Sequence, residues 1–418
     1  MEKFTNKMTV QDIDVTGKRV LVRVDYNVPL DETGQVRDNW RITASLPTLK
    51  YLLSKNAKII LLSHLGRPKG SVNPAMSLRP VQAELARLLD HPVDFADDCI
   101  GPKAQKAVGL MRNGDILLLE NLRFYAQEEA NDLGFARDLA ALGDIYVDDA
   151  FGTAHRAHAS TEGITHYLPS VAGFLLEEEI NCLSREPADP QRPYVAILSG
   201  AKASDKIRLI ENLLTHADKI MLGGGLANTF LLAQGYDVKN SLVDLERVDL
   251  ARELMARPEG AKIVLPVDVI AAEAVRAGAD HKTVDLEDIP PGWGTVDIGP
   301  KTIDIYSQAV MTAGTVLWNG PLGVYEIPEF SKGTALVGRA VAQSRAFSIL
   351  GGGDLAAAVR RDGLTDKINH ICTGGGAMLA YLKGKPLRAV EALTDKVAAF
   401  PLDPSLDIEA QMQEGTFF

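Results

Sequence analysis

Short apolar runs rich in β-branched residues alternate with amphipathic stretches along most of the chain. Each run predicts a buried β-strand, and the amphipathic stretch after it predicts a helix that covers the sheet. The predicted strands are Lys18–Val28, Lys58–Ser63, Asp115–Glu120, Ile145–Asp148, Tyr194–Ser199, Lys219–Leu222, Ala261–Pro266, Thr315–Asn319 and Phe347–Leu350. Such alternation is typical of parallel sheets with helices on both faces, so we expect an α/β fold.

The pattern changes near the middle of the chain. Phe174–Arg185 is a predicted helix that carries three consecutive glutamates, and Glu186–Pro193 then holds three prolines before the next buried strand. A proline-rich segment of this kind is typical of a linker. We therefore expect a first lobe at 1–173, a helix and linker at 174–193 and a second lobe at 194–400. Residues 401–418, with several acids, are expected to form a strap rather than another strand–helix unit.

The residues that follow the predicted strands differ between the two halves. Ligands of open α/β sheets bind beyond the carboxyl ends of the strands. In the first half these positions carry Arg23, Arg41, Arg67, Arg123 and Arg156, with His64, His155 and His158. In the second half they carry Gly200 with Lys202, Gly223–Gly225, Gly320, Gly323, Gly351–Gly353 and Gly374–Gly376. The first half is thus predicted to bind a multiply charged anion and the second half a nucleotide.

Each of these signals also has an ordinary structural interpretation. A single arginine or histidine at a strand end is most often a solvated charge or a structural hydrogen-bonding group, and a single glycine run most often serves tight packing. Three glycine triplets in one half favour phosphate binding, because turns are made equally well by Asn, Asp or single glycines. Asp354 follows one triplet and suits a Mg²⁺ ion on nucleotide phosphates, with a helix N-cap as the alternative. The fingerprints of a standard P-loop and of an NAD site are both absent.

Composition and charge narrow the classes of function. The chain has 418 residues and a formal net charge of −11. Such a charge repels nucleic acid and anionic membranes, so neither is an expected partner, and an anion site must be a local concentration of basic side chains. Three widely spaced cysteines predict neither a disulfide framework nor a zinc site. Without a cleavable signal or a long apolar run, the expected location is the cytoplasm.

A series of motifs in this sequence resembles the phosphoglycerate kinase family. The motifs are RVDYNVPL, SHLGRP, ENLRF, DDAFGTAHRAH, SGAKASDKI, LGGGLANTF, DIGPKT, WNGPLGVYE, GGGDLAAAV and TGGGAMLAYLKGK, in order from Arg23 to about Lys396. The resemblance implies two Rossmann-like lobes joined by a hinge helix, with 3-phosphoglycerate on the first lobe and Mg-nucleotide on the second. It also implies that the C-terminal strap returns to the first lobe.

The resemblance further implies roles for individual residues. The substrate would be bound by Asp25, Asn27, Arg41, His64, Leu65, Gly66, Arg67, Arg123 and Arg156. The nucleotide, ADP or ATP, would be bound by Gly200, Lys202, Lys206, Asn319, Glu326, Gly352, Gly353, Asp354 and Leu355, with Asp354 as the Mg²⁺ ligand. Arg41, Lys202, Gly375 and Gly376 would act on the phosphoryl group during transfer.

Several positions depart from the motifs of this family, mostly in the nucleotide half. Ser199 and Thr295 stand where a glycine is usual, Asn228 stands where an aromatic residue is usual, and Leu355 stands in place of a Ser or Thr. A hydroxyl at position 355 would donate a hydrogen bond to a phosphate oxygen, an interaction worth roughly 1.5 to 3 kcal/mol. We therefore expect Leu355 to weaken nucleotide binding and Leu355→Thr to strengthen it.

The predicted activity is reversible transfer of the acyl phosphate of 1,3-bisphosphoglycerate to Mg-ADP, which gives 3-phosphoglycerate and ATP, by a monomer whose lobes close about the hinge. No general base is expected, because the acceptor carboxylate is already ionised at neutral pH. Two alternatives remain open. One is a nucleotide-binding pseudoenzyme or scaffold of the same fold, and the other is a nicotinamide-dependent oxidoreductase, which lacks its glycine fingerprint here. Assays of turnover and of hydride transfer distinguish them.

Overall fold

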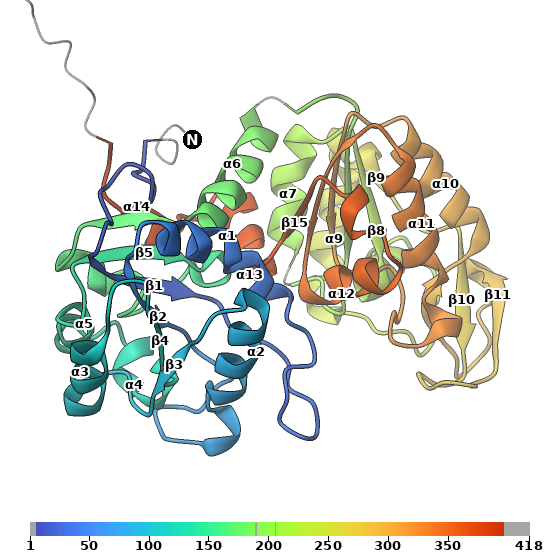
Figure 1. Ribbon diagram of the computed structural model, residues 1–418. Coiled ribbons are helices and arrows are strands. Elements are labelled where there is room, and N and C mark those ends of the chain that lie inside the picture. The colour runs from blue at the N-terminus through green and yellow to red at the C-terminus, as the bar shows by residue number, and fades with distance from the viewer. Residues whose placement is uncertain (1–5, 189, 205, 397–418) are drawn as a thin grey trace, which may run out of the picture.

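The computed structural model describes residues 6–188, 190–204 and 206–396. Two lobes, each built around a parallel sheet, lie side by side, and helix α6 (Phe174–Ala188) runs between them (Figure 1). This confirms the predicted α/β fold with two parallel-sheet lobes. The predicted strap, residues 401–418, lies outside the described residues. No described helix is both long enough and apolar enough to cross a membrane.

The sheet of the first lobe has six parallel strands in the order β3-β4-β2-β1-β5-β6. Its strands are β1 (Arg19–Val24), β2 (Lys58–Leu62), β3 (Asp94–Ala96), β4 (Ile116–Leu119), β5 (Ile145–Asp149) and β6 (Ser170–Ala172). Its helices are α1 (Trp40–Ser54), α2 (Arg79–Leu89), α3 (Gly101–Leu110), α4 (Ala126–Glu129) and α5 (Leu133–Ala140).

Both faces of this sheet are covered, which explains the uninterrupted apolar runs in the sequence. Val20 and Val22 of β1 belong to one buried cluster, while Leu21 between them belongs to a second cluster on the opposite face. A parallel sheet with helices on both sides buries every residue of its central strands, so no polar alternation appears.

The sheet of the second lobe also has six parallel strands, in the order β15-β14-β13-β7-β8-β9. They are β7 (Tyr194–Ser199), β8 (Lys219–Gly223), β9 (Ile263–Val264), β13 (Thr315–Asn319), β14 (Phe347–Gly351) and β15 (His370–Cys372). The helices are α7 (Ile207–His216), α8 (Gly224–Ala233), α9 (Val248–Ala256), α10 (Pro300–Met311), α11 (Lys332–Gln343), α12 (Gly353–Arg361) and α13 (Gly375–Leu382).

A small antiparallel sheet, which the sequence pattern did not predict, projects from the second lobe. Its order is β11-β10-β12, with β10 (Asp268–Ala272), β11 (His281–Asp285) and β12 (Gly294–Ile298). In β11 only Val284 is buried, so this strand lacks the apolar run that marks the strands of the two large sheets.

The last described segment of the chain returns to the first lobe. Helix α14 (Arg388–Glu391) begins beside Ala154, whose carbonyl accepts from Ala389 N at 3.0 Å. Thr394 then pairs with strand β6 and with the N-terminal segment, since its N–H donates to Ser170 O at 2.9 Å and its carbonyl accepts from Met8 N at 2.8 Å. Figure 1 shows α14 against the first lobe. These residues lie within the 194–400 range predicted for the second lobe.

Candidate active site

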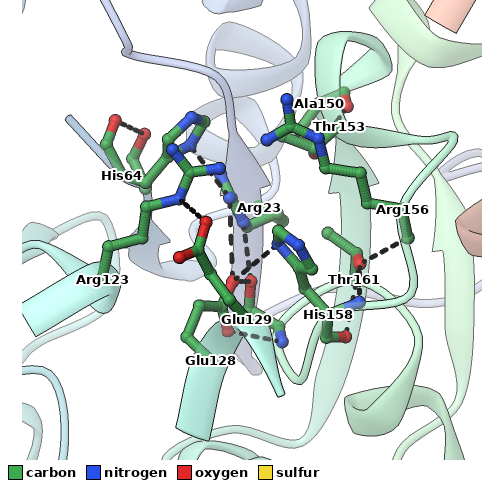
Figure 2. A network of polar contacts seen from close by, with 12 residues as sticks. Arg23, His64, Arg123, Glu128, Glu129, Ala150, Thr153, Arg156, His158 and Thr161 are labelled. Atoms are coloured by element: carbon green, nitrogen blue, oxygen red, sulfur yellow. Dashed lines mark hydrogen bonds and ion pairs between the residues drawn. The ribbon is translucent and has the colours of Figure 1, made fainter. Parts of the chain in front are cut away.

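Cationic side chains of the first lobe gather in one network beyond the end of β1 (Figure 2). Arg23 is fully buried, and its Nε donates to Ser160 Oγ at 2.8 Å while an Nη atom donates to His64 Nδ1 at 3.1 Å. The carboxylate of Glu128, also fully buried, lies 4.0 Å from the same guanidinium and accepts from Ser160 N at 3.0 Å. A buried counter-charge thus holds Arg23 in place.

Arg123 and Arg156 enter the same network from two other loops. Arg123 is buried, donates to Gly66 O at 2.8 Å and lies 3.2 Å from a carboxylate oxygen of Glu129. Arg156 is partly buried, and its Nε donates to His155 Nε2 at 3.3 Å. The predicted anion-binding arginines are therefore brought together, with Arg67 the exposed member at the edge.

The imidazoles of this network are neutral at pH 7. Burial, followed by the charges of nearby arginines, lowers the pKa of His64 well below its ordinary value. The same causes lower the pKa of His158 to about 3, and burial followed by the charge of Arg156 lowers that of His155 to about 4. The positive charge of the site therefore belongs to guanidinium groups, and the histidines serve as neutral hydrogen-bonding groups.

Arg41 is held by two other residues predicted to bind substrate. Its Nη1 lies 3.1 Å from Asp25 Oδ2 and donates to Asn27 O at 3.0 Å. The side chain of Asn27 accepts from Gly66 N at 2.9 Å. Leu65 has a buried side chain, so only its backbone could contribute to a ligand site. These residues form the wall of the network nearest to helix α1.

A cleft of about 930 Å³ opens beside the glycine-rich strand ends of the second lobe. Its lining includes Ser199, Gly200, Gly224, Gly225, Asn228, Thr295, Leu322, Glu326 and Asp354. The predicted nucleotide residues Gly200, Glu326 and Asp354 thus share one cavity. Lys202, Lys206, Asn319, Gly352, Gly353 and Leu355 do not line it.

Two of those remaining residues are buried beneath the glycine loops. The ammonium group of Lys206 donates to Ser199 O, and a Cβ placed on Gly200 would lie 2.7 Å from its Nζ. Asn319 Nδ2 donates to Gly351 O at 3.0 Å and so ties the end of β13 to the end of β14. Asn319 therefore shapes the loops, and Lys202 lies exposed outside the cleft.

Helix α12 begins at the second glycine triplet, Gly351–Gly353, with Gly352 as its N-cap at φ +108°. Asp354 in its first turn is exposed, and its carboxylate accepts a long 3.4 Å hydrogen bond from Tyr325 Oη. One exposed carboxylate beside free N–H groups fits Mg²⁺, which takes few protein ligands and prefers phosphate oxygens and water.

Leu355 has a different environment from the one expected. Its side chain is fully buried in the cluster around Trp318, Leu350 and Val359. It can offer a nucleotide only its backbone N–H. The side chain at the third helical position points into the core, which argues against the expectation that a hydroxyl here would reach a phosphate.

The other departures from the family motifs lie together on one wall of the cleft. Thr295 Oγ1 donates to Asn228 Oδ1 at 2.9 Å, and Asn228 Nδ2 donates to Leu242 O at 3.1 Å. Ser199 Oγ is buried and has no hydrogen-bond partner within the described part of the chain. Thr295 and Asn228 thus form a hydrogen-bonded pair in the cleft lining, to which Ser199 also belongs.

The two lobes touch around this site. At the start of α13, the Gly374 backbone packs against the Gly152 backbone, and a Cβ on Gly376 would lie 3.5 Å from His155 Cε1. The guanidinium of Arg360 in α12 lies 5.4 Å from the ring centroid of Trp40, beside Arg41. The start of α13 therefore faces the cation network of the first lobe, and the last turn of α12 contacts the start of α1.

The sequence analysis missed Glu128 and the pair of Trp40 and Arg360. Glu128 stands in a run with Glu129, which reads as a solvated acidic pair, and only the fold shows that one of the two is buried. Trp40 precedes Arg41 directly, but its partner Arg360 lies in the other lobe. A lone tryptophan beside a predicted site residue was the one available signal.

The chain is similar to known proteins in both sequence and fold. The family model described as phosphoglycerate kinase matches residues 10–385. A phosphoglycerate kinase of Moorella thermoacetica is 54% identical over 392 residues, which cover 93% of this chain and 100% of the relative. One from Chloroflexus aurantiacus is 52% identical over 397 residues, covering 93% and 99%. The solved phosphoglycerate kinase of Pyrococcus horikoshii OT3 superposes with a TM-score of 0.84 at 33% identity, covering 92% of this chain and 98% of that one.

Proposed function

Because the chain belongs to the phosphoglycerate kinase family, we propose that its first-lobe cation network binds phosphoglycerate and its second-lobe cleft binds the nucleotide. The chain is a phosphotransferase with a carboxyl acceptor, which transfers a phosphoryl group reversibly between 1,3-bisphosphoglycerate and ADP. One observation supports this assignment of the two ligands to the two lobes. The buried network around Arg23 lies in the first lobe, whose residues Gly152 and His155 face the glycine-rich start of α13 in the other lobe.

The substrate carries a phosphate and a carboxylate, and both match the guanidinium groups of the network. Arg67, Arg123 and Arg156 would bind the phosphate and carboxylate, with His64 as a neutral donor. Asp25 and Asn27 would accept hydrogen bonds from the glycerate hydroxyl. The support is that these residues share one site, in which Arg123 is buried and therefore acts in a weakly screened environment.

The nucleotide would lie in the cleft between Glu326 and Asp354. Glu326 would bind the ribose hydroxyls, and the N–H groups of Gly353, Asp354 and Leu355 would face the phosphates at the start of α12. Asp354 would hold Mg²⁺, which when bound neutralises charge on the phosphate oxygens. Lys206 would reach a phosphate by exchanging the carbonyl of Ser199 for a phosphate oxygen.

In the transfer itself, Arg41 and Lys202 would stabilise charge on the phosphoryl group, together with the N–H groups of Gly375 and Gly376 at the start of α13. Phosphoryl transfer needs positioning and charge neutralisation rather than covalent help from the protein. The substrate carboxylate is already an anion at neutral pH, so no base is assigned.

Hinge closure is part of this proposal. The lobes predicted at 1–173 and 194–400 are joined by α6 and the 174–193 segment, and reactants on separate lobes must come into contact with water excluded. Small-angle scattering should give a smaller radius of gyration with both substrates bound than with either alone. An unchanged radius would contradict closure.

We assign the enzyme to the cytoplasm as a monomer that binds neither nucleic acid nor membranes, in line with its net charge of −11. A pseudoenzyme is disfavoured because Arg41, Lys202, Lys206 and Asp354 are all retained. The deciding experiment is a coupled assay of 3-phosphoglycerate with Mg-ATP, with Arg41→Ala as control. Turnover by the natural chain that Arg41→Ala abolishes is expected, and nucleotide binding without turnover would support the scaffold instead.

A further inference from the structure

Helix α6 and strand β15 face each other through four residues that can bind metal ions. Glu179 and Cys182 are three positions apart and so share one face of the helix, and His370 and Cys372 are two positions apart and so share one face of the strand. Two of the three cysteines of the chain, Cys182 and Cys372, thus lie on these two elements. Because Cys182 and Cys372 are far apart in the sequence, the spacing rules for zinc sites did not predict a site here.

The geometry of the cluster is tight. One ligand atom each from Glu179, His370 and Cys372 lies within 4.8 Å of the other two, and all three residues are buried. Glu179 Oε2 lies 2.9 Å from His370 Nε2. Cys182 does not belong to this group of three, so as a fourth ligand its thiol would turn toward the group from its place three positions after Glu179 on α6.

We propose that Glu179, Cys182, His370 and Cys372 form a binding site for a borderline divalent cation of the Zn²⁺ class. One carboxylate oxygen, one imidazole nitrogen and two sulfurs make a four-ligand set that suits tetrahedral Zn²⁺. Mg²⁺ prefers oxygen ligands, so this set selects against the ion used with the nucleotide. The site is distinct from the substrate network and from the cleft.

The surroundings already provide what a metal site requires beyond its ligands. Glu179 Oε1 accepts from Thr373 N at 2.6 Å and from Thr373 Oγ1 at 2.8 Å, which fixes the carboxylate and leaves Oε2 for the ion. Access exists from the solvent side, since Cys182 is partly exposed. There the carboxylate of Glu178, whose side chain is 65% exposed, lies 3.7 Å from His370 Nδ1.

Metal binding at this site exchanges protons for the ion. The cation displaces the proton between His370 Nε2 and Glu179 Oε2 and the thiol protons of Cys182 and Cys372, and all three protons pass to water. Affinity should therefore increase as pH rises.

A bound ion would tie the interlobe helix to the strand that leads directly into Gly374 and α13. Without the ion, α6 and β15 are joined at this point by the contacts of Glu179 with His370 and Thr373. Four coordinate bonds would make that connection more rigid, so a Zn²⁺-loaded chain should unfold at a higher temperature than the metal-free one.

The test is a titration of the full chain with Co²⁺ in the absence of nucleotide, followed by Zn²⁺. A thiolate-to-cobalt charge-transfer band that saturates at one Co²⁺ per chain and disappears on adding Zn²⁺ is expected. The double variant Cys182→Ala/Cys372→Ser should lose the band. Cys99→Ala is the matched control, because it removes the remaining thiol, which is buried in the first lobe, and should keep the band.

Circular dichroism melting of each variant separates loss of the site from loss of the fold. A double variant that is folded, lacks the band and has a melting temperature independent of Zn²⁺ supports the site. The proposal is overturned if the natural chain gives no charge-transfer band, or if the double variant keeps it. None of these readouts uses turnover, so the outcome is independent of the proposed phosphoryl transfer.

Discussion

The groups proposed to bind a ligand in the first lobe are side chains, several of them buried and charged. Those proposed in the second lobe are mainly backbone N–H groups at helix starts. Arg23 and Arg123 are buried beside the carboxylates of Glu128 and Glu129. The cleft of about 930 Å³ instead begins at glycine runs, with Asp354 exposed at its edge. An anion would thus interact with full side-chain charges in the first lobe and with helix dipoles in the second lobe.

The arginine network and the helix starts differ in how they depend on the rest of the fold. Burying a guanidinium is unfavourable unless a carboxylate and hydrogen bonds compensate it, so each member of the first-lobe network depends on its partners. A helix start carries its partial charge on the backbone and needs no buried partner. Substitutions in the network should therefore affect stability as well as binding, whereas those at the helix starts should act mainly through packing.

The largest effect is expected for the residues assigned to the transition state. Arg41→Ala and Lys202→Ala should each lower kcat about 10² to 10³-fold, which corresponds to loss of roughly 3 to 4 kcal/mol, with little change in KM. Steady-state kinetics with both substrates checks this. A variant with near-normal kcat would remove that residue from the catalytic assignment.

The second prediction concerns the buried carboxylate of Glu128 beside Arg23. Glu128→Ala leaves the buried guanidinium of Arg23 without its carboxylate, so the free energy of unfolding should fall by about 3 to 5 kcal/mol. Urea unfolding measures it. Glu273→Ala removes an exposed partner of Arg276 in the second lobe and should cost less than about 1 kcal/mol. Equal losses in the two variants would contradict the difference between the lobes.

The third effect concerns the buried side chain at the start of α12. Leu355→Thr should lower the free energy of unfolding by roughly 2 to 4 kcal/mol, because it replaces core volume with a hydroxyl. KM for Mg-ADP should stay unchanged. Leu355→Met, of similar volume, should cost less than about 1.5 kcal/mol. Tighter nucleotide binding by the threonine variant would restore the original expectation.

The smallest effect is a pH dependence specific to the first lobe. The pKa of His158 is lowered to about 3 by burial and then by the arginines, so between pH 6.5 and that value the unfolded chain binds a proton that the native chain does not. Stability therefore falls as pH falls, by about 1 kcal/mol between pH 6.5 and 5.5 for this group. His158→Gln should flatten that part of the unfolding profile. An unaltered slope would show that the imidazole is protonated in the native state.

The parallel strands could be predicted because two-sided burial gives long apolar runs. Strands β3, β6 and β15 have three residues each and were missed, since so short a run does not stand out from a loop. The antiparallel sheet was missed because β11 is mostly exposed and polar. Periodicity reports burial, so elements that are short or exposed leave no such pattern.

The candidate site was predicted less completely than the fold, for a related reason. Motifs identify which residues lie near the strand ends, but they do not show where a side chain points. Leu355 lies at the expected position in the chain and yet faces the core, and Lys206 bonds to Ser199 O beneath the loop. Glu128 and the pair of Cys182 and Cys372 depend on contacts between distant segments, which no local pattern contains.

The contact of Gly152 and Gly374 gives the interlobe boundary an unusual mechanical property. Gly152 in the 3₁₀ turn η3 (Phe151–Thr153) and Gly374 at the start of α13 meet backbone to backbone, with no room for a methyl group on Gly374. Neither glycine has a side chain to order at this contact, so bringing the two backbones together costs no side-chain entropy of their own. The same feature makes the boundary intolerant of added volume: an alanine at position 374 would act as a wedge between the two backbones.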